Sequence, residues 1–395
     1  MAKEVVIVGM ARTPIGSYGK SLAPLTAPQL GAHAIKSAVE RAGLKPEDVQ
    51  EVFFGNVLSA AIGQAPARQA TLSAGLPHTV PATTVNKVCA SGTKATMFAA
   101  QNIMLGQGDV IVSGGMESMS NTPYYVPNAR FGYRMGDGKL IDGMVHDGLW
   151  DAYNNYHMGM SAEKCASDHG LSREDQDEYA MLSYRRAKEA TDNGNMKNEL
   201  VPIEIPGRKG SVTISVDEEF SQVNFDKVPA LKPAFKRDGG TVTAANASSL
   251  NDGAAALVLM SREKADQLGL KPLARIRSMA DAAKAPEDFT TAPTPAMALA
   301  FERAGVQAGD IDYFEINEAF SVVTQSNARN LGLKDYEKVN VFGGAVSLGH
   351  PIGCSGARII VTLLNVLQTK DATMGAVGIC NGGGGASAMV VERLS

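Results

Sequence analysis

Two of the four cysteines stand in surroundings that suit nucleophilic chemistry. Cys89 lies in NKVCASG (86–92), between an apolar stretch and small residues that begin a predicted helix. Free N–H groups and the dipole at a helix N-terminus stabilise a thiolate. Cys380 ends an apolar run in ICNGGGG (379–385), where glycines let backbone N–H groups approach a ligand closely. A lone cysteine is more often structural, and the glycines could also form a tight turn, so both interpretations stay open.

A histidine and an amide add acid–base and hydrogen-bonding groups. His350 lies among glycines in GGAVSLGHPIGCSGA (343–357), where an imidazole can act as a general base or donate to an oxyanion. Asn317 and Glu318 directly follow a predicted strand, EI, and precede AFS. The structural alternatives are a surface-loop histidine and a helix cap, and these residues alone do not decide between them.

The composition of the chain limits its class and its partners. It has 395 residues, enough for about two or three domains, with 44% hydrophobic and 20% charged residues. The net charge of −4 provides no basic field, so neither nucleic acid nor a membrane is expected as a partner. Four cysteines without a C-x-x-C pair argue against a disulfide framework and a zinc site.

The start of the sequence, MAKEVVIVGMART, has neither the apolar region of a secretory signal nor the Arg and Ser content of a transit peptide. No run of about 18 consecutive apolar residues occurs, so no membrane-spanning helix is expected. Free thiols fit a reducing compartment. We therefore expect a cytoplasmic protein, with the mitochondrial matrix as the alternative if a transit peptide has been removed.

Strands and helices alternate along the chain. Short apolar runs at 4–8, 51–58 and 109–115 predict buried strands. A helix opened by small residues covers about 91–105. An earlier helix is predicted to bury one face, formed by Leu30, Ala34, Ile35, Ala38 and Ala42. This alternation is typical of an α/β fold with a mostly parallel sheet.

Two parts of the sequence repeat. Residues 40–56 align without a gap to 302–318, and five positions are identical. Residues 89–117 are also similar to 354–385: a small-residue helix start, an apolar helix, a polar turn, a strand and glycines. Two similar halves therefore flank a different middle, about 121–248, which is either a surface insertion or a substrate-covering segment.

Together these segments resemble the thiolase family over essentially the whole chain. The family's motifs occur in its order and spacing: NKVCASG, GGMESMS (114–120), NEAF (317–320), GGAVSLGHPIGCSG and CNGGGGASA. The segments TVTAANASSLNDGAAALVLM (241–260) and YNNYHMGMSAEKCA (153–166) are most similar to the potassium-responsive, mitochondrial-type acetyl-CoA acetyltransferase branch.

The resemblance implies an α/β thiolase fold with duplicated βαβαβαββ halves. The halves form a five-layer α/β/α/β/α arrangement with an inserted loop domain. The N-terminal half would comprise 1–120 and 249–271, the loop domain 121–248, and the C-terminal half 272–395. The loop domain would bind coenzyme A and make tetramer contacts. A homotetramer, as a dimer of dimers, is the expected assembly, with 122–143 as the candidate contact segment.

The resemblance also implies a role for five residues. Cys89 would be the nucleophile that is acetylated, and His350 would activate it and donate to a thioester oxygen. Cys380 would exchange protons with the substrate's α-carbon and the leaving thiol. Asn317 would hold a water at the same oxyanion site, and the N–H groups of Cys89 and Gly382 would form a second oxyanion hole. Cys165 and Cys354 match no catalytic role.

The implied reaction is the reversible Claisen condensation of two acetyl-CoA molecules to acetoacetyl-CoA and CoA, with ping-pong kinetics through acetyl-Cys89. A thiolate carrier retains the energy of the thioester, and the separate oxyanion sites suit the chemistry. No cofactor is required, and coenzyme A is a substrate or product. The alternatives are a broader-chain 3-ketoacyl-CoA thiolase of fatty-acid β-oxidation and a non-catalytic lipid carrier. A decarboxylating ketoacyl synthase would have histidine in place of Cys380.

Further residues follow from the resemblance alone. The pantetheine arm would contact Leu149, His157, Met158, Ser248, Ala319 and Phe320. A potassium ion would be held by the Tyr184 hydroxyl and the carbonyl oxygens of Ala244, Ala245, Ala247 and Val346. Relatives often carry a basic residue for the CoA nucleotide in a loop that here reads EEFSQVNF (218–225), with Ser221 and Gln222.

Overall fold

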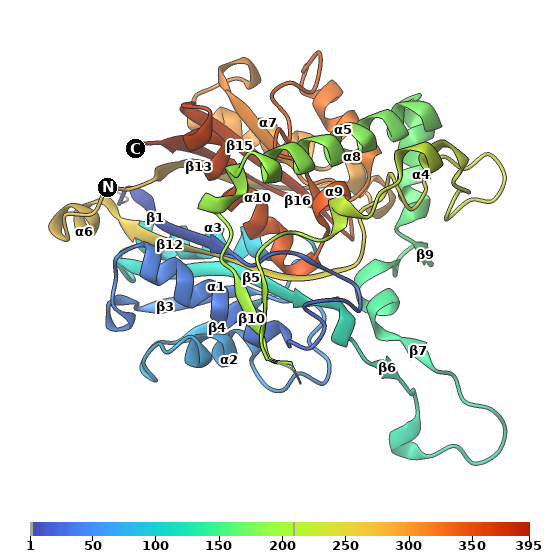
Figure 1. Ribbon diagram of the computed structural model, residues 1–395, viewed down its shortest axis with the longest axis horizontal. Helices are drawn as coiled ribbons and strands as arrows, with labels where there is room; N and C mark the ends of the chain where they lie inside the picture. Colours follow the sequence, from blue (N-terminus) through green and yellow to red (C-terminus); the bar gives the residue numbers. More distant parts are fainter. Residues whose placement is uncertain (1–2, 208–209) are drawn as a thin grey trace.

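Ten strands of the protein form one mixed sheet. The computed structural model describes residues 3–207 and 210–395 (Figure 1). In the N-terminal half the strands are β1 (Val5–Arg12), β2 (Gly16–Ser17), β3 (Glu51–Gly55), β4 (Ala82–Val85), β5 (Val110–Ser118) and β12 (Asn251–Ser261). In the C-terminal half they are β13 (Ala274–Ala283), β14 (Tyr313–Ile316), β15 (Met374–Asn381) and β16 (Gly385–Arg393). The order is β14-β15-β16-β13-β1-β12-β5-β3-β4, with β2 beside β12.

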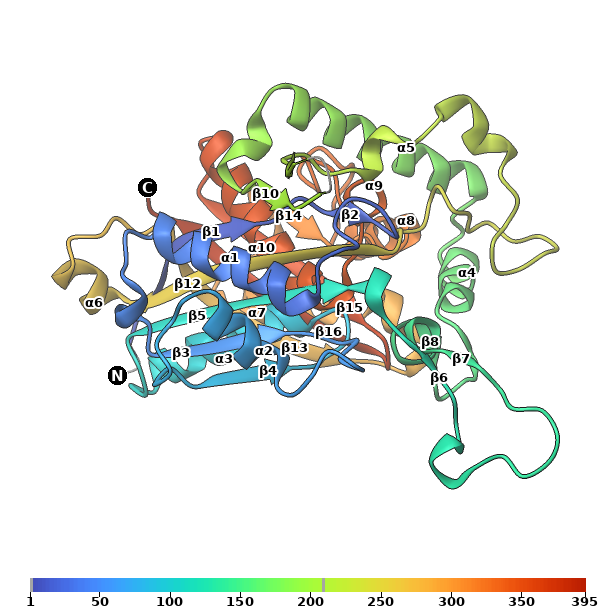
Figure 2. The same cartoon turned by 60° about the horizontal axis from the view of Figure 1, so that its bottom comes forward.

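The strands of each half form one layer, and helices form three more layers, one between the two strand layers and one on each outer face (Figures 1 and 2). The helices are α1 (Ala27–Arg41), α2 (Pro66–Ser73), α3 (Ser91–Met104), α6 (Arg262–Gln267), α7 (Pro293–Ala304), α8 (Ser321–Asn330), α9 (Ala345–Leu348) and α10 (Ile352–Thr369). One apolar cluster packs α3 and α10 between the strands of both halves. A second packs α1 and α2 on the N-terminal strands, and a third packs α7 on the C-terminal strands. The expected α/β/α/β/α arrangement is therefore present.

The expectation of a mostly parallel sheet was wrong. Only β3 with β4, β3 with β5, and β14 with β15 are parallel among the described strand pairs. The long strand β12 runs antiparallel to both β1 and β5, and β16 runs antiparallel to β13 and β15. Because β12 follows the middle segment rather than a crossover helix, the local alternation of strand and helix does not reveal its direction.

The first repeat is confirmed in detail. Gly43 and Gly305 end α1 and α7 with φ values of 71° and 70°, the left-handed conformation that favours glycine. A short 3-10 turn follows each glycine, at 46–48 and at 308–310. The strands β3 and β14 then begin at equivalent places. The two copies therefore share backbone conformation as well as residue pattern.

The second repeat is shifted by one residue from the alignment that begins at Cys89 and Cys354. The two central helices cross at Gly92 and Gly356, where a Cβ on Gly92 would lie 2.5 Å from the backbone nitrogen of Ala357. Thr93 Oγ1 also donates to Gly356 O at 2.8 Å. Because Gly92 meets Gly356, the Ser-Gly pairs of the helices are equivalent, and Cys89 corresponds to Gly353.

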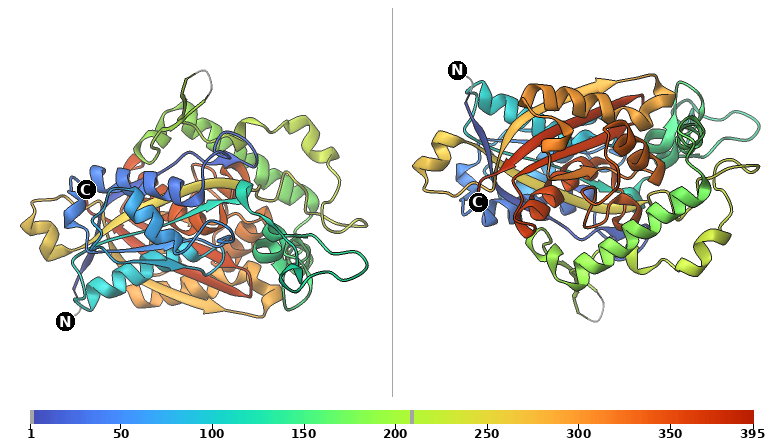
Figure 3. Two further views of the ribbon diagram at one scale, coloured as in Figure 1. Left: turned by 90° about the horizontal axis from the view of Figure 1, so that it is seen from below. Right: turned by 90° about the horizontal axis from the view of Figure 1, so that it is seen from above.

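The first part of the middle segment lies at one end of the layers (Figure 3). The elements of the whole segment are β6 (Tyr124–Tyr125), β7 (Ile141–Asp142), β8 (Trp150–Asp151), β9 (Tyr156–His157), α4 (Gly159–Asp168), α5 (Arg173–Asp192), β10 (Ile203–Ile205) and β11 (Val212–Ile214). Its helix α5 runs along one side of the body, and its strand β10 packs against the cluster of α1. The loop between β6 and β7 projects away from the body (Figure 1). Its side chains Phe131, Met135 and Leu140 are 86%, 98% and 67% exposed.

The helix α10 is long and apolar enough to cross a membrane by length and composition, with a mean hydropathy of 1.3. It is the only such helix within residues 3–207 and 210–395. In the fold, 89% of its residues are buried, because strands of both halves and α3 surround it. Its apolar composition is therefore that of a central core helix.

Candidate active site

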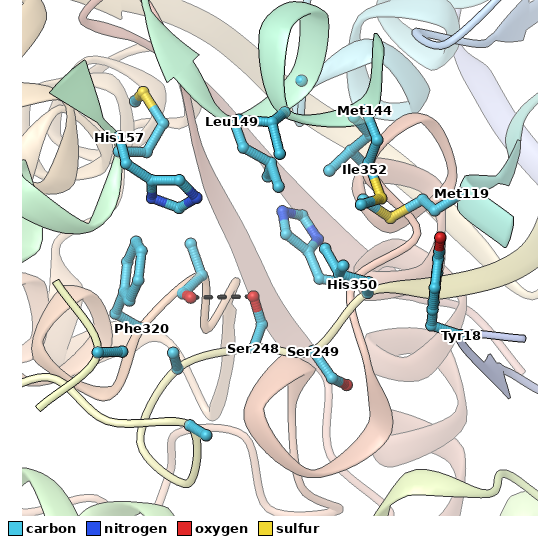
Figure 4. A pocket seen from close by; sticks show the side chains of 18 of the residues that line it. Tyr18, Met119, Met144, Leu149, His157, Ser248, Ser249, Phe320, His350 and Ile352 are labelled. Carbon is cyan, nitrogen blue, oxygen red and sulfur yellow. Dashed lines mark hydrogen bonds between the residues drawn. The ribbon is translucent and has the colours of Figure 1, made fainter. Parts of the chain in front are cut away.

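A cavity of about 640 Å³ lies where loops of both halves meet the middle segment (Figure 4). Several residues predicted from the sequence line it: Cys89, Leu149, His157, Met158, Ser248, Ala319, Phe320, His350 and Gly382. Cys380 and Asn317 are 0% and 1% exposed and lie behind its wall. Cys380 packs in the same apolar cluster as Met158 and Phe320. The structure thus brings the expected catalytic set to one place.

A strained backbone turn positions Cys89 just before α3. Val88 has a φ of 48°, which a β-branched residue rarely adopts. The Ser91 hydroxyl donates to Val88 O at 2.6 Å and accepts from the N–H of Lys87 at 2.9 Å. The Asn86 side chain accepts the N–H of Val88 at 3.0 Å. These bonds hold the conformation that presents Cys89 to the cavity.

The Cys89 thiol stays protonated at neutral pH when no ligand is bound in the cavity. Burial raises its pKa to about 11, while the N–H groups of Gly382 and of Cys89 itself act in the opposite direction. The nearby Glu117 carboxylate raises the pKa further. We expected the helix N-terminus to stabilise a thiolate, but loss of hydration outweighs that effect. The nucleophile therefore requires a base.

His350 lines the same cavity and can accept a proton, although the burial that keeps it neutral also makes it a weak base. Burial, followed by the charge of Arg358, lowers the pKa of the imidazole to about 3, so the ring is neutral. Its Nδ1 lies 2.6 Å from Ser355 Oγ, and Ser355 Oγ donates to Pro351 O at 3.0 Å. Because the Ser355 hydroxyl donates its hydrogen to the Pro351 carbonyl, its oxygen can accept a hydrogen bond from Nδ1–H of His350. The imidazole then carries its hydrogen on Nδ1, and Nε2 keeps a lone pair. Nε2 has no hydrogen-bond partner among the described residues. The backbone N–H of His350 is fixed by Asn251 at 2.9 Å.

Asn317 directly follows β14, and Cys380 is the second-last residue of β15, the parallel neighbour of β14. The Asn317 N–H donates to Gly378 O at 2.9 Å, which continues the ladder of β14 and β15. Neither polar atom of the Asn317 side chain has a partner in the described part of the protein. A buried amide of this kind has bonds to offer to a water or ligand. Burial and the proximity of Cys89 raise the pKa of Cys380 far above its usual value.

Glu318 is a buried carboxylate that fixes the strand end. It accepts from Tyr179 and Ser183 of α5, both at 2.8 Å, from Asn340 at 2.9 Å, and from the N–H of Val346 at 3.0 Å. Four donors satisfy the charge without an ion pair. Glu318 therefore joins α5 and α9 to the segment that carries Asn317.

Glu117, in the GGMESMS motif, has a corresponding function that sequence reasoning did not identify. Its carboxylate accepts from Asn56 at 2.7 Å, from Val57 N and Leu58 N, both at 3.1 Å, and from Gly353 N at 2.9 Å. Burial raises its pKa to about 7. Glu117 thus connects the ends of N-terminal strands to the first turn of α10, three residues beyond His350.

The middle of the cavity has aromatic and apolar walls. His157 stacks on Phe235, with centroids 4.6 Å apart, and Phe235 meets Phe320 edge to face at 6.1 Å. Burial lowers the pKa of His157, which keeps it neutral. Ser248 Oγ donates to Ala319 O at 2.9 Å (Figure 4). These walls can enclose a flexible, mostly apolar ligand arm. Sequence reasoning missed other lining residues: Met119, Met144, Leu250, Phe289 and Ile352.

The mouth of the cavity is polar. The lining residues Tyr18, Lys20 and Gln222 are exposed there, and Glu219 is partly buried. Lys20 Nζ donates to Gln222 Oε1. No motif marks Lys20 or Tyr18, and more than 200 residues of sequence separate Lys20 from its partner. Only the fold shows that they belong to the cavity.

The five residues of the predicted cation site come from three segments. Tyr184 of α5 and Val346 of α9 share a small apolar cluster, whereas Ala244 and Ala247 line the cavity. In the described part of the chain, no donor bonds to the carbonyl oxygens of Ala244, Ala245 or Ala247. Unpaired carbonyl oxygens are hard ligands that suit an alkali cation.

Comparison with known proteins identifies the family. The model described as "Thiolase, N-terminal domain" matches residues 5–263, and "Thiolase, C-terminal domain" matches 270–393. The chain belongs to the thiolase family of acyltransferases.

Within this family, similar proteins are named acetyl-CoA acetyltransferases. The chain is 59% identical over 392 residues to the cytosolic acetyl-CoA acetyltransferase ERG10 of Gibberella zeae, covering 99% of this chain and 98% of the relative. It is 55% identical to acetyl-CoA acetyltransferase 1 of Arabidopsis thaliana, covering 100% and 95%. The Acat5 thiolase from Ascaris suum, solved in complex with coenzyme A, has a TM-score of 0.94 at 43% identity and covers 99% of this chain and 100% of its own.

Proposed function

We propose that this protein is an acetyl-CoA acetyltransferase that condenses two acetyl-CoA molecules to acetoacetyl-CoA and CoA, and also catalyses the reverse thiolysis. The names of relatives at 59% and 55% identity support this substrate. The observation that carries the chemistry is the pairing, in one largely apolar cavity, of a buried thiol at Cys89 with the unpartnered Nε2 of neutral His350.

In the first half-reaction, His350 Nε2 takes the proton of Cys89. The thiolate attacks the carbonyl carbon of acetyl-CoA, and the N–H groups of Cys89 and Gly382 stabilise the negative oxygen. The bond from that carbon to the CoA sulfur then breaks. The leaving thiolate takes the proton of Cys380 and departs as CoA. Acetyl-Cys89, protonated His350 and a Cys380 thiolate remain.

In the second half-reaction, the Cys380 thiolate takes an α-proton from a second acetyl-CoA. Because burial raises the pKa of Cys380 far above its usual value, its thiolate is a strong base. The enolate oxygen is stabilised by His350 Nε2–H and by a water held by Asn317. The carbanion attacks acetyl-Cys89, acetoacetyl-CoA forms, and the Cys89 sulfur leaves with the proton of His350. All three groups regain their starting protonation states.

A potassium site is part of this proposal. The Tyr184 hydroxyl and the carbonyl oxygens of Ala244, Ala245, Ala247 and Val346 would hold the ion. A bound ion would order the segment before Ser248 and link it to α9, which precedes His350. The three carbonyl oxygens without donors in the described part of the chain support the assignment.

We also propose a homotetramer and a cytosolic location. The exposed apolar loop between β6 and β7 favours a further interface, because so much apolar surface is costly in water. Segment 121–248 would act as a loop domain that covers the substrate between the halves 1–120 plus 249–271 and 272–395. A relative at 59% identity is named cytosolic. Light scattering of the purified protein measures the assembly, and a mass of one or two chains would contradict the tetramer.

The decisive experiment measures thiolysis of acetoacetyl-CoA and of a long-chain 3-ketoacyl-CoA. Each substrate is assayed with potassium chloride and with sodium chloride at the same ionic strength. Preference for the four-carbon substrate, increased by potassium, supports both the acetyltransferase and the cation site. Equal or faster long-chain thiolysis without a potassium effect would instead indicate a fatty-acid β-oxidation enzyme without that site.

A further inference from the structure

The mouth of the cavity contains one positive charge, on Lys20, beside the partly buried carboxylate of Glu219. Among the described lining residues, Lys20 is the only lysine or arginine. It is exposed, as are Tyr18 and Gln222, whereas Cys89 at the inner end is 9% exposed. The cavity therefore runs from a buried reactive thiol to a polar opening with an exposed ammonium group. Its ends differ in the way that the ends of an acyl-CoA differ.

Coenzyme A has its thioester at one end and its negative charge at the other. The pyrophosphate and the 3′-phosphate of the nucleotide remain near water when the thioester reaches a buried nucleophile. A phosphate binds most strongly to a cationic group that also donates hydrogen bonds to it. Without this cation the mouth would disfavour the same ligand, because the Glu219 carboxylate would repel its phosphates.

We propose that Lys20 binds the nucleotide phosphates of coenzyme A at the mouth of the cavity. This rests on the proposed function, and it adds a residue that no motif marks. Gln222 in the 218–225 loop is neutral, so the charge comes instead from the turn after β2. The ammonium group of Lys20 lies against Gln222, at the position where that loop reaches the cavity.

Neighbouring residues hold Lys20 without neutralising it. The Lys20 N–H donates to Ser17 O at 3.0 Å, which closes the turn. Nζ donates to the Gln222 amide oxygen, and Gln222 Nε2 donates to Ser17 Oγ at 2.6 Å. The carboxylate of Glu219 accepts from Ser17 Oγ at 2.6 Å instead. No ion pair forms at Lys20 among the described residues, so two of its ammonium hydrogens are available.

The test compares substrates with and without the nucleotide. Thiolysis is measured with acetoacetyl-CoA plus CoA, and with acetoacetyl-pantetheine plus pantetheine, for the wild type and Lys20→Ala. We expect kcat/KM with the CoA pair to fall about three- to tenfold, mainly through KM, and the change with the pantetheine pair to be much smaller. The dependence on salt concentration should also become weaker with the CoA pair.

Two further variants make the test specific. Lys36→Ala removes the same charge from α1, where the side chain is 63% exposed and pairs with Glu40 at 4.0 Å. Its kinetics should match the wild type. Gln222→Arg in the Lys20→Ala background returns a charge to the mouth and should recover most of the lost kcat/KM. A general folding defect would affect both substrate pairs and would not be rescued.

3′-Dephospho-CoA identifies the phosphate that Lys20 contacts. If Lys20→Ala weakens CoA and dephospho-CoA equally, the pyrophosphate is bound; if only CoA is weakened, the 3′-phosphate is bound. Either result supports the proposal. Equal losses with the CoA and pantetheine pairs, or no loss with CoA, would overturn it. Calorimetric binding of CoA and pantetheine gives the same comparison without turnover, so an error in the reaction assignment remains distinguishable from an error about Lys20.

Discussion

The two halves of the molecule have equivalent backbones but different polar residues. Phe54 of β3 faces Gly114 of β5, as Ile316 of β14 faces Gly378 of β15. The residues directly after Phe54 and Ile316 are Gly55 and Asn317. Duplication thus produced two similar strand ends, and at this position only the C-terminal one carries a side-chain amide, which has no hydrogen-bond partner among the described residues.

The next equivalent positions differ in the same way. Two residues beyond the paired glycines, the N-terminal half has Met116 and the C-terminal half has Cys380. At the starts of the two central helices the reactive residue lies in the other half: the N-terminal half has Cys89, and the equivalent residue of the C-terminal half is Gly353. One half therefore provides the proposed nucleophile and the other the proposed base. A symmetrical scaffold can carry an asymmetrical reaction because its two copies meet at the crossing of α3 and α10.

The strongest test of this comparison is Cys89→Ala against Cys354→Ala. Loss of the nucleophile should reduce condensation and thiolysis by about 10⁴-fold or more. Cys354 is 1% exposed in the core at the equivalent helix start, and its variant should retain activity within about threefold. Steady-state rates in both directions measure this. If Cys354→Ala were also inactive, the assigned asymmetry of the helix starts would fail.

Cys380→Ala should separate the two half-reactions. Acetylation of Cys89 by acetyl-CoA should continue slowly and add one acetyl group by intact-protein mass spectrometry. Condensation should fall by about 10³-fold or more, because no base remains for the α-proton. Exchange of the acetyl-CoA methyl hydrogens with deuterated water should stop as well. Cys165→Ser is the control, and rapid acetoacetyl-CoA synthesis by Cys380→Ala would contradict the role of this base.

Glu117→Gln and Glu318→Gln compare the two buried carboxylates. Each accepts four hydrogen bonds, so both variants should lose about tenfold in rate through displaced loops. Of the two carboxylates, only Glu117 raises the pKa of the Cys89 thiol through its negative charge. Removing that negative charge lowers the pKa of the thiol, so alkylation of Cys89 by iodoacetamide should shift to lower pH in Glu117→Gln alone. Identical pH profiles for both variants and the wild type would refute this coupling.

His350 should make the fold sensitive to acid. Burial lowers its pKa to about 3, so below about pH 6.5 the unfolded chain binds a proton that the folded chain does not. The free energy of unfolding should therefore fall with decreasing pH, by about 2 kcal/mol at pH 5 from this group. Urea titrations at several pH values test this. In His350→Asn this part of the pH dependence should vanish, and its persistence would show that other groups cause it.

Much of the scaffold follows from the sequence because its signals are local. The predicted apolar face of α1 is buried throughout, from Leu30 to Ala42. The repeat of 40–56 at 302–318 reappears as matching glycine caps. Five short motifs in the family's order, among them those that contain Cys89, His350 and Cys380, were together enough to recognise the resemblance. These signals depend on residues close together in the chain, where periodicity and backbone preferences act.

Tertiary structure decided what depends on distant partners. The antiparallel direction of β12 depends on a strand separated from it by the whole middle segment. The pKa of Cys89 depends on burial, which overrides the helix N-terminus expected to lower it. The crossing of α3 and α10 at Gly92 and Gly356 shows which residues of the second repeat are equivalent, whereas an alignment that begins at Cys89 and Cys354 is one residue out of register. Lys20 belongs to the cavity only because folding brings it to Gln222. Solvation and electrostatics are properties of packed neighbours, and adjacent sequence letters do not specify them.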